Sequence, residues 1–282
     1  HFWPPGSGSR RAAFDYVPEG DTVYLAATRL HGALAGEKIV RSDLRVPRYA
    51  TRDLTGATVE RVVPRGKHLL FQLDDGSTLH THFKMEGTWH LYRTGDRWRG
   101  GPAHEIRAIL ETGPWTAVGW RLGLVELLDV PEVDRLVAAL GPDVLGPDWD
   151  PAEVLARMQK EPERAIGEVL LDQTVIAGPG NVYKCEVCFL RGAHPETPVG
   201  SVPDLPALIG LVKRLMDVNR TTGSQITTGD ARPGHKRWVY GRGRQPCRRC
   251  GTLIERRDEP GERVTYWCPS CQPLIGPPAG PI

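Results

Sequence analysis

The chain has 282 residues with a formal net charge of +2, and 40% of its residues are hydrophobic. This length allows two domains with sizeable cores, and the composition is ordinary for a globular protein. The sequence contains no apolar run long enough to span a bilayer and no convincing signal peptide, which argues against a membrane-bound or secreted protein. We therefore expect no membrane partner.

The amino-terminal stretch differs in composition from the rest of the chain. Residues 1–16 include the run Pro-Pro-Gly-Ser-Gly-Ser, which predicts a flexible leader. Asp21 then offers an N-cap for a helix, because apolar residues follow it at helical spacing from Val23 to Leu34.

From about residue 38 to residue 130 the pattern changes to short strands separated by turns. Residues 58–63, 68–73 and 107–111 are examples of such strands. Their number and spacing are typical of a β-sandwich or barrel. His80 and His82 alternate on one strand and would share a face, which we interpret as a half-buried pair with satisfied hydrogen bonds.

The chain becomes helical after the Gly-Pro-Asp sequence at residues 141–143. Pro151 suits the first position of a helix, with Asp150 as its cap. Two helices joined by a Gly/Pro turn at residues 177–181 suit a nucleic-acid clamp. The two joined helices are expected over residues 162–173 and 182–190, and a further helix over residues 205–220. Cys185 and Cys188 fall inside one of them, and we interpret both as small buried hydrophobic residues.

Two other cysteine pairs have the spacing of a zinc site. Cys247-x2-Cys250 is followed, after seventeen residues, by Cys268-x2-Cys271. Four thiolates in two close pairs suit one tetrahedral Zn²⁺, and a closed site of this kind is structural because it has no open position. Cysteines used in this way favour a reducing compartment over a secreted disulfide scaffold.

The segment between the two cysteine pairs predicts a zinc-pinned β-hairpin. Residues 252–254 and 264–267 are strand-like, and residues 256–261 form the turn between them. The stretch 232–263 carries ten Lys or Arg residues against four acids, a net charge of +6. A basic stripe on a zinc module favours phosphate binding, although an ordinary solvated surface is an alternative of similar weight.

Several separated motifs resemble one known family in the same order along residues 17–272. They are Pro18-Glu19-Gly20-Asp21, Arg65-Gly66-Lys67, Gly141-Pro142-Asp143-Val144-Leu145, Leu171-Asp172-Gln173, Ala177-Gly178-Pro179-Gly180-Asn181 and Tyr266-Trp267-Cys268-Pro269. Together they are similar to the formamidopyrimidine-DNA glycosylase and endonuclease VIII family. The Gly-Pro-Asp-Val-Leu and Tyr-Trp-Cys-Pro motifs favour the endonuclease VIII branch.

The resemblance implies an α+β fold. It combines an N-terminal antiparallel β-sandwich and an N-terminal helix with a C-terminal helical domain, which holds a helix–two-turn–helix and a zinc-finger β-hairpin. We predict domain boundaries as follows: a leader at 1–16, a catalytic sandwich at 17–140, a helix–two-turn–helix domain at 141–236, a zinc hairpin at 237–273 and a tail at 274–282.

The resemblance also implies a bifunctional DNA glycosylase and AP lyase that acts on oxidised bases, with pyrimidines expected. Pro18 would be the nucleophile that forms a Schiff base with the sugar, and Glu19 the general acid and base. Lys67 would contact phosphate and donate a proton. Arg263 would clamp the phosphates beside the lesion together with Asn181, and β- and δ-elimination would then cut the strand.

A loop at Lys84-Met85-Glu86 stands where the family inserts side chains into the gap left by an extruded base. Lys84 and Glu86 differ from the residues usual in the endonuclease VIII branch, and Ala139 stands where that branch often has arginine. Fewer side chains are then left to hold the opposite base, so we expect weak selectivity for that base. The expected partner is damaged DNA, either duplex or single-stranded. We expect a cytoplasmic, nucleoid-associated monomer.

The largest departure from the family pattern is that seventeen residues precede Pro18. A proline nitrogen within a peptide bond is a tertiary amide and cannot form an iminium. We expect the natural protein to begin at Val17, with residues 1–16 arising from a vector or an overextended gene start. The alternatives are a non-catalytic protein that binds DNA lesions, and a zinc-ribbon nucleic-acid module fused to an unrelated β-domain.

Overall fold

The computed structural model describes residues 17–276, so the predicted leader and the end of the tail lie outside the described residues. The chain forms two compact units. Of the described residues, the first unit contains Val17, Pro18 and residues 22–139, and the second contains residues 19–21 and 140–276. Within the described residues, no helix is long and apolar enough to cross a membrane.

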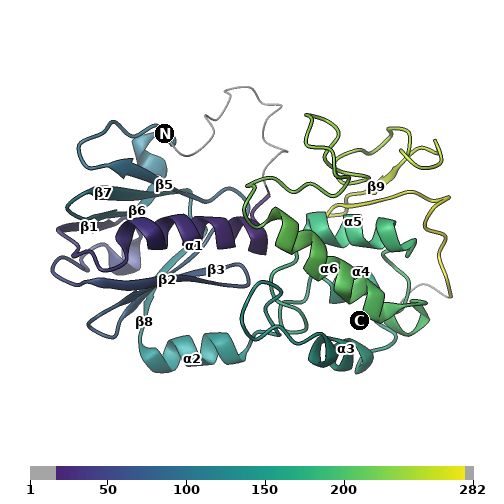
Figure 1. The fold of residues 1–282 in the computed structure, drawn as a ribbon, viewed down its shortest axis with the longest axis horizontal. Coiled ribbons are helices and arrows are strands. Elements are labelled where there is room, and N and C mark those ends of the chain that lie inside the picture. The colour runs from purple at the N-terminus through teal and green to yellow at the C-terminus, as the bar shows by residue number, and fades with distance from the viewer. Residues whose placement is uncertain (1–16, 277–282) are drawn as a thin grey trace. The chain divides into compact units, whose positions relative to one another are not determined.

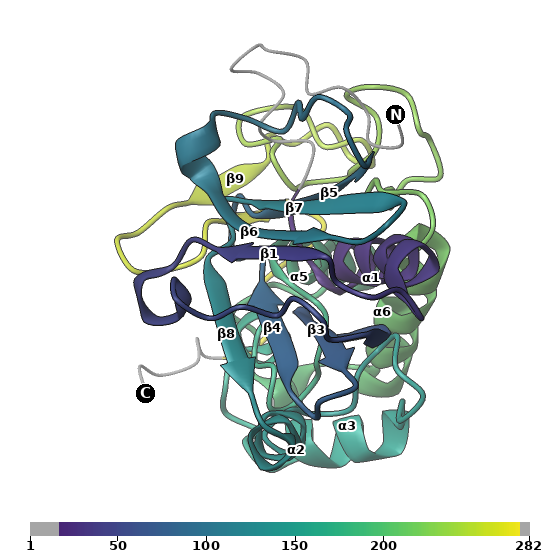
Figure 2. The ribbon, with the colours of Figure 1, turned by 90° about the vertical axis from the view of Figure 1, so that its left-hand side faces the viewer.

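The first unit is an antiparallel sandwich, as predicted (Figures 1 and 2). One four-stranded sheet has the order β1-β6-β7-β5, and the other has the order β2-β3-β4-β8, in the part of the chain that the structure describes. The strands are β1 (Arg41–Leu44), β2 (Val59–Arg65), β3 (His68–Leu73), β4 (Thr78–His82), β5 (Thr88–Arg93), β6 (Ile106–Glu111), β7 (Trp115–Trp120) and β8 (Leu124–Leu128). Helix α2 (Val130–Ala138) follows the last strand, and short 3₁₀ helices occupy Pro47–Tyr49 and Ala103–Glu105.

The core of this unit lies between the two sheets and includes helix α1 (Gly20–Leu34). Leu30 and Leu34 from the helix are buried in it with Leu69 and Phe71 of β3 and Leu110 of β6. Burial of such large apolar side chains contributes about 1.5–3 kcal/mol each. Because β3 alternates, His68, Leu70 and Gln72 project from the opposite face of their sheet.

The start of α1 differs from the expectation. The helix begins at Gly20, so Asp21 lies in its first turn and is not the N-cap. The physical reason is a competing partner within the second unit, because the carboxylate of Asp21 accepts a hydrogen bond of 2.9 Å from the Tyr183 hydroxyl.

The second unit is helical, as expected. Its helices are α3 (Pro151–Gln159), α4 (Ile166–Val169), α5 (Asn181–Arg191) and α6 (Leu205–Asn219), with a 3₁₀ turn at Val199–Ser201. The predicted cap of α3 is confirmed, since the Asp150 side chain accepts from the backbone N–H groups of Ala152 and Glu153 with Pro151 at the first position.

The helix expected over residues 162–173 is wrong in length, because only Ile166–Val169 is helical. The backbone N–H groups of Ile166 and Gly167 donate to the carbonyls of Thr197 and Pro195. At the other end, the carboxylate of Asp172 accepts from both the N–H and the hydroxyl of Thr174, which forms a turn. These contacts replace the bonds that a longer helix would need.

The carboxy-terminal hairpin is present, with a shifted first strand. Strand β9 covers Glu255–Arg257 and pairs antiparallel with β10 (Thr265–Trp267). The strand predicted at residues 252–254 is instead a single bridge between Leu253 and Pro246. The backbone there is tied to the cysteine knuckle, because the Cys247 N–H donates to the Thr252 carbonyl at 2.8 Å.

Candidate active site

Glu19 is held at the amino terminus of α5 within the second unit. Its side chain is only 1% exposed. One carboxylate oxygen accepts from the Val182 N–H at 2.7 Å, and the other accepts from the Gly180 N–H at 2.8 Å and the Tyr183 N–H at 3.4 Å. A helix amino terminus has unpaired N–H groups and a partial positive charge, so it favours an anion. The motif residue next to Pro18 is therefore rigidly oriented.

Two glycines make this approach possible. A Cβ added at Gly180 would lie 2.6 Å from Cδ of Glu19, and one added at Gly20 would lie 2.8 Å from Cα of Gly178. Gly20 also donates its N–H to the Gly178 carbonyl at 2.9 Å. Gln173 supports the same turn, since its amide accepts from the Gly178 N–H and donates to the Pro179 carbonyl.

Tyr183, in the first turn of α5, is the third residue whose backbone N–H donates to this carboxylate. Burial raises the pKa of its hydroxyl well above the usual value, and the nearby charges of Asp21 and Glu19 raise it further. The hydroxyl therefore stays protonated and donates to Asp21. Neither Tyr183 nor Gln173 was assigned a role from the sequence, because only the folded turn brings them beside Glu19.

Asn181 contacts the backbone segment that carries Arg263. The Asn181 side chain donates to the Val264 carbonyl at 2.7 Å, and Arg263 immediately precedes that residue. Lys184, one turn along α5, is buried and donates to the Thr265 hydroxyl at 2.7 Å, and that hydroxyl donates to the Arg263 carbonyl. Helix α5 therefore fixes the backbone that carries Arg263.

Lys67 and the Lys84 loop lie at one end of a sheet in the first unit. Lys67 belongs to the two-residue turn between β2 and β3. His68, which follows it, pairs with His82 at the end of β4, so the turn that carries Lys84 and Met85 is at the same end.

The Lys84 loop is a tight turn with an exposed tip. Lys84 has a positive φ of 54°, and its N–H donates to Nδ1 of His82 at 2.9 Å. Gly87 closes the turn by donating its N–H to the Phe83 carbonyl. The Met85 side chain at this tip is 57% exposed.

The four predicted zinc ligands converge. The sulfur atoms of Cys247, Cys250, Cys268 and Cys271 all lie within 4.8 Å of one another, with separations of 3.4 Å for Cys250–Cys268 and 3.9 Å for Cys247–Cys271. Zinc–sulfur bonds near 2.3 Å in a tetrahedron require sulfur separations of about 3.8 Å. The residues therefore fit one structural Zn²⁺.

The other cysteine pair behaves as predicted from the sequence. Cys185 and Cys188 are fully buried in α5. Burial raises the pKa of both thiols, that of Cys188 to about 12, so each stays protonated. Within the described residues, the metal-type grouping contains neither of them.

Much of the basic stripe is already paired with other groups of the second unit. Arg242 and Arg248 donate to backbone carbonyls, Arg257 pairs with Glu196, and Arg256 pairs with Asp258. Fewer of its charges are therefore available to phosphates than the net charge of residues 232–263 indicated.

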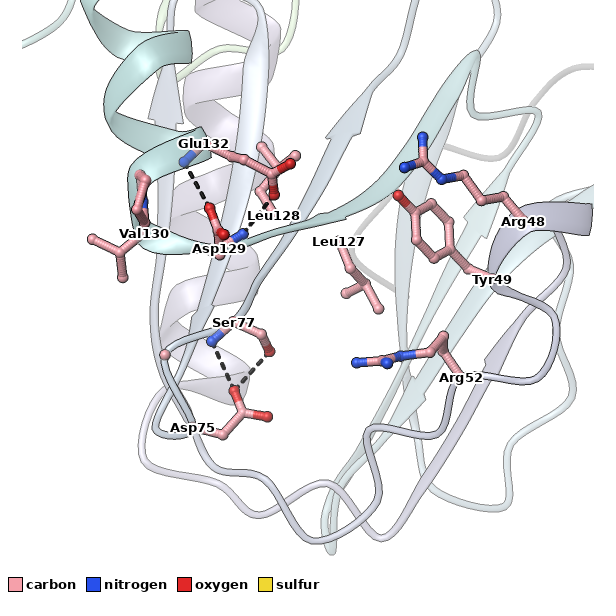
Figure 3. Close-up of a pocket in the computed structure, with 12 residues that line it drawn as sticks. Arg48, Tyr49, Arg52, Asp75, Ser77, Leu127, Leu128, Asp129, Val130 and Glu132 are labelled. Atoms are coloured by element: carbon pink, nitrogen blue, oxygen red, sulfur yellow. Dashed lines mark hydrogen bonds between the residues drawn. The ribbon is translucent and has the colours of Figure 1, made fainter.

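A surface hollow of about 630 Å³ lies elsewhere in the first unit (Figure 3). Arg48 and Arg52 line one side, and Asp75 and Asp129 line the other. The two acids are already used locally, since Asp75 accepts from Ser77 and Asp129 caps α2. None of the residues predicted for the site lines this hollow.

Three family models match successive parts of the chain. The formamidopyrimidine-DNA glycosylase N-terminal domain matches residues 17–118, the formamidopyrimidine-DNA glycosylase H2TH domain matches residues 140–226, and the zinc finger found in FPG and IleRS matches residues 244–274. The chain therefore belongs to the formamidopyrimidine-DNA glycosylase and endonuclease VIII family, whose enzyme class is DNA glycosylase and AP lyase.

Individual relatives agree with this assignment. The chain is 53% identical over 269 residues to a probable endonuclease 8 2 of Streptomyces coelicolor, which covers 94% of this chain and 97% of the relative. It is 48% identical to the DNA-(apurinic or apyrimidinic site) lyase Nei2 of Mycolicibacterium smegmatis, over 91% of this chain and 99% of the relative. The fold matches Lactococcus lactis formamidopyrimidine-DNA glycosylase, solved with DNA containing an AP site, with a TM-score of 0.76 and 25% identity over 90% of this chain and 99% of that one.

Proposed function

We propose that this chain removes oxidised bases, pyrimidines above all, through a Schiff base on Pro18 followed by β,δ-elimination. The observation that carries the proposal is the Glu19 carboxylate, which is buried, bound by three backbone N–H groups and adjacent in the chain to Pro18. A group fixed in this way is preorganised for proton transfer next to the nucleophile.

The proposed reaction begins when the secondary amine of a free Pro18 attacks C1′ of the damaged nucleotide. The N–C1′ bond forms, the glycosidic bond breaks, and the base leaves with a proton delivered through Glu19. Opening of the sugar ring then gives an iminium between Pro18 and C1′. Loss of a proton from C2′ expels the 3′ phosphate, and a second elimination expels the 5′ phosphate.

The remaining predicted residues would hold the DNA. Arg263 and Asn181 would contact the phosphates beside the lesion, supported by the anchoring of both to the α5–β10 region. Lys67 would contact phosphate and supply a proton. Met85 would fill the gap left by the extruded base, supported by its exposure at a turn tip. Lys84, Glu86 and Ala139 differ from the residues usual at these positions in the endonuclease VIII branch. We therefore infer little selectivity for the opposite base and activity on single-stranded or bubble DNA.

The proposed chemistry requires Pro18 to be the free amino terminus. The match to the family's N-terminal domain begins at residue 17, which supports this requirement. If Pro18 remains within a peptide bond, its nitrogen has no usable lone pair. A chain in that state would be the second candidate, a non-catalytic protein that binds DNA lesions.

Substrate class is tested with a chain that begins at Pro18 and single-turnover assays on labelled oligonucleotides. The substrates are duplexes with one oxidised pyrimidine, one oxidised purine or one AP site, each also supplied as a single strand. We expect faster removal of the pyrimidine and strand ends that carry phosphate on both sides of the gap. Faster removal of the purine would overturn the substrate assignment, and strand ends from β-elimination alone would overturn the δ-elimination step.

A further inference from the structure

A partly buried chain of hydrogen bonds crosses the sheet of β3, β4 and β8, next to the turn that carries Lys67. Oε1 of Glu126 on β8 lies 2.9 Å from Nδ1 of His80 on β4. Nε2 of His80 lies 2.8 Å from Nδ1 of His68 on β3. His80 is 1% exposed, and all three residues are on the sheet face opposite the apolar core. No step of the proposed reaction uses them.

The chemistry of the three groups fixes where the protons lie. Burial lowers the pKa of His80 and, to about 4, that of His68, so both rings are neutral near pH 7. The carboxylate of Glu126 can only accept, so Nδ1 of His80 carries that ring's proton and Nε2 is an acceptor. Nδ1 of His68 must then be the donor, which leaves Nε2 of His68 without a proton.

The hydrogen-bond chain ends at His68, next to two lysines. Lys67 directly precedes His68, and its positive charge lowers the pKa values of both His68 and His82. The positive charge of Lys84 also lowers the pKa values of these two rings. The ring centroids of His68 and His82 are 5.1 Å apart in an edge-on contact. A protonated imidazole here would repel both ammonium groups, so a neutral ring with a fixed orientation is the form compatible with them.

We propose that Glu126 and His80 are positioning residues for Lys67, acting through a His68 ring that they hold in one tautomer and one orientation. The inference rests on the role of Lys67 in the proposed function. His68 is the first residue after the turn and pairs with Arg65 across its base. Fixing the His68 ring therefore fixes one side of the two-residue turn from which Lys67 projects. Apolar side chains at these positions would bury the His68 ring without fixing its orientation. The hydrogen bonds from Glu126 through His80 fix it.

The principal test is a double-mutant cycle between Glu126 and Lys67. It uses the chain that begins at Pro18 and is otherwise complete. Single-turnover rates of AP-site cleavage and apparent DNA affinities are measured for Glu126→Leu, Lys67→Ala and the double variant. We expect Glu126→Leu to lower the rate about tenfold with affinity nearly unchanged, and to have an effect below about twofold once Lys67 is alanine. Glu126→Gln retains an acceptor for His80 and should restore most of the rate.

Glu111→Leu is the matched control, because Glu111 is also a partly buried strand glutamate with a hydrogen-bonded partner, Arg41. It should leave the rate unchanged. Additive effects of Glu126→Leu and Lys67→Ala would overturn the inference while leaving the role of Lys67 intact. A harmless Lys67→Ala would instead remove Lys67 from the proposed function, and the inference with it.

A second measurement does not depend on how the variants fold. Long-range ¹⁵N–¹H correlation spectra of the unmodified chain report which ring nitrogen of each histidine carries the proton. We expect protons on Nδ1 of both His80 and His68. A proton on Nε2 of His68 near pH 7 would overturn the hydrogen-bond chain on which the inference is built.

Discussion

The two units hold their candidate site residues in different ways. In the second unit, Glu19 and Asn181 are at least nine-tenths buried, and backbone groups at the start of α5 and before β10 fix them. In the first unit, Lys67 and Met85 are carried on tight turns between strands, and Met85 is mostly exposed. The group proposed to transfer protons is therefore held rigidly, whereas Lys67 and Met85, two of the groups proposed to meet DNA, lie on tight turns.

The sharpest way to break this comparison is to change the preorganised acid. Glu19→Gln replaces one oxygen by an NH₂ group, which cannot accept from the α5 N–H groups and cannot transfer the proton. We expect removal of an intact damaged base to fall by roughly 10²-fold or more, as general acid–base catalysis contributes about that much. Cleavage of a pre-formed AP site should persist, because no base has to leave.

Glu168→Gln, an exposed change on α4, serves as the control for Glu19→Gln and should leave both activities unaltered. Equal loss of base removal and AP-site cleavage in Glu19→Gln would mean that Glu19 acts on the strand-cutting steps or on the fold.

Loss of zinc should damage the second unit selectively. Cys268→Ser removes one thiolate, so the hairpin that carries Arg263 should lose its order, since structural zinc supplies much of the folding free energy of such modules. We expect zinc content well below one ion per chain and a DNA affinity reduced at least tenfold. Cys188→Ala, in the buried pair, should retain one zinc. An unaltered zinc content in Cys268→Ser would refute the ligand set.

Acid should weaken the first unit through its partly buried histidines. Burial lowers the pKa of His90 on β5 to about 4, below the unfolded value of about 6.5. The unfolded chain therefore binds more protons between these values, so the stabilising effect of a neutral His90 is complete above pH 6.5 and is lost as the pH falls towards 4. Between pH 7 and pH 5 this amounts to about 2 kcal/mol.

Urea unfolding of the parent chain and of His90→Gln at both pH values measures this contribution. The loss of stability on acidification should be about 2 kcal/mol smaller in the variant. Identical losses in the two proteins would show that His90 does not titrate as its burial requires.

The smallest expected effect concerns phosphate contacts. Removing one contact with Arg263→Ala should reduce the slope of log affinity against log salt by roughly 0.9 on duplex DNA, or about 0.7 on single strands, for all sequences alike. Arg214→Ala is the control, because Arg214 is an exposed arginine on α6 outside the basic stripe. A slope that changes in neither variant would remove Arg263 from the phosphate contacts.

Local patterns predicted local structure well. The cap at Asp150, the existence of the short strands and the convergence of the four cysteines depend mainly on short-range chemistry. The over-long helix at residues 162–173 shows the limit, because its N–H groups are taken by carbonyls of residues 195 and 197 that no local pattern reveals.

The site was predicted only in part for the same reason. Glu19 and Lys67 were identified through the family resemblance, but the bonds from α5 to Glu19 join residues more than 160 positions apart. The Glu126–His80–His68 chain depends on the register of β3, β4 and β8, which the sequence does not encode in any short motif.

The central claim is that the amine of Pro18 forms the covalent intermediate, and borohydride trapping tests it most directly. The chain cut so that Pro18 is the free amino terminus should be trapped on DNA with an AP site or an oxidised pyrimidine, and peptide mapping should place the adduct on Pro18. The chain that retains residues 1–17 should trap little or nothing. Equal trapping by both forms, with the adduct on Lys67 or another amine, would contradict the account.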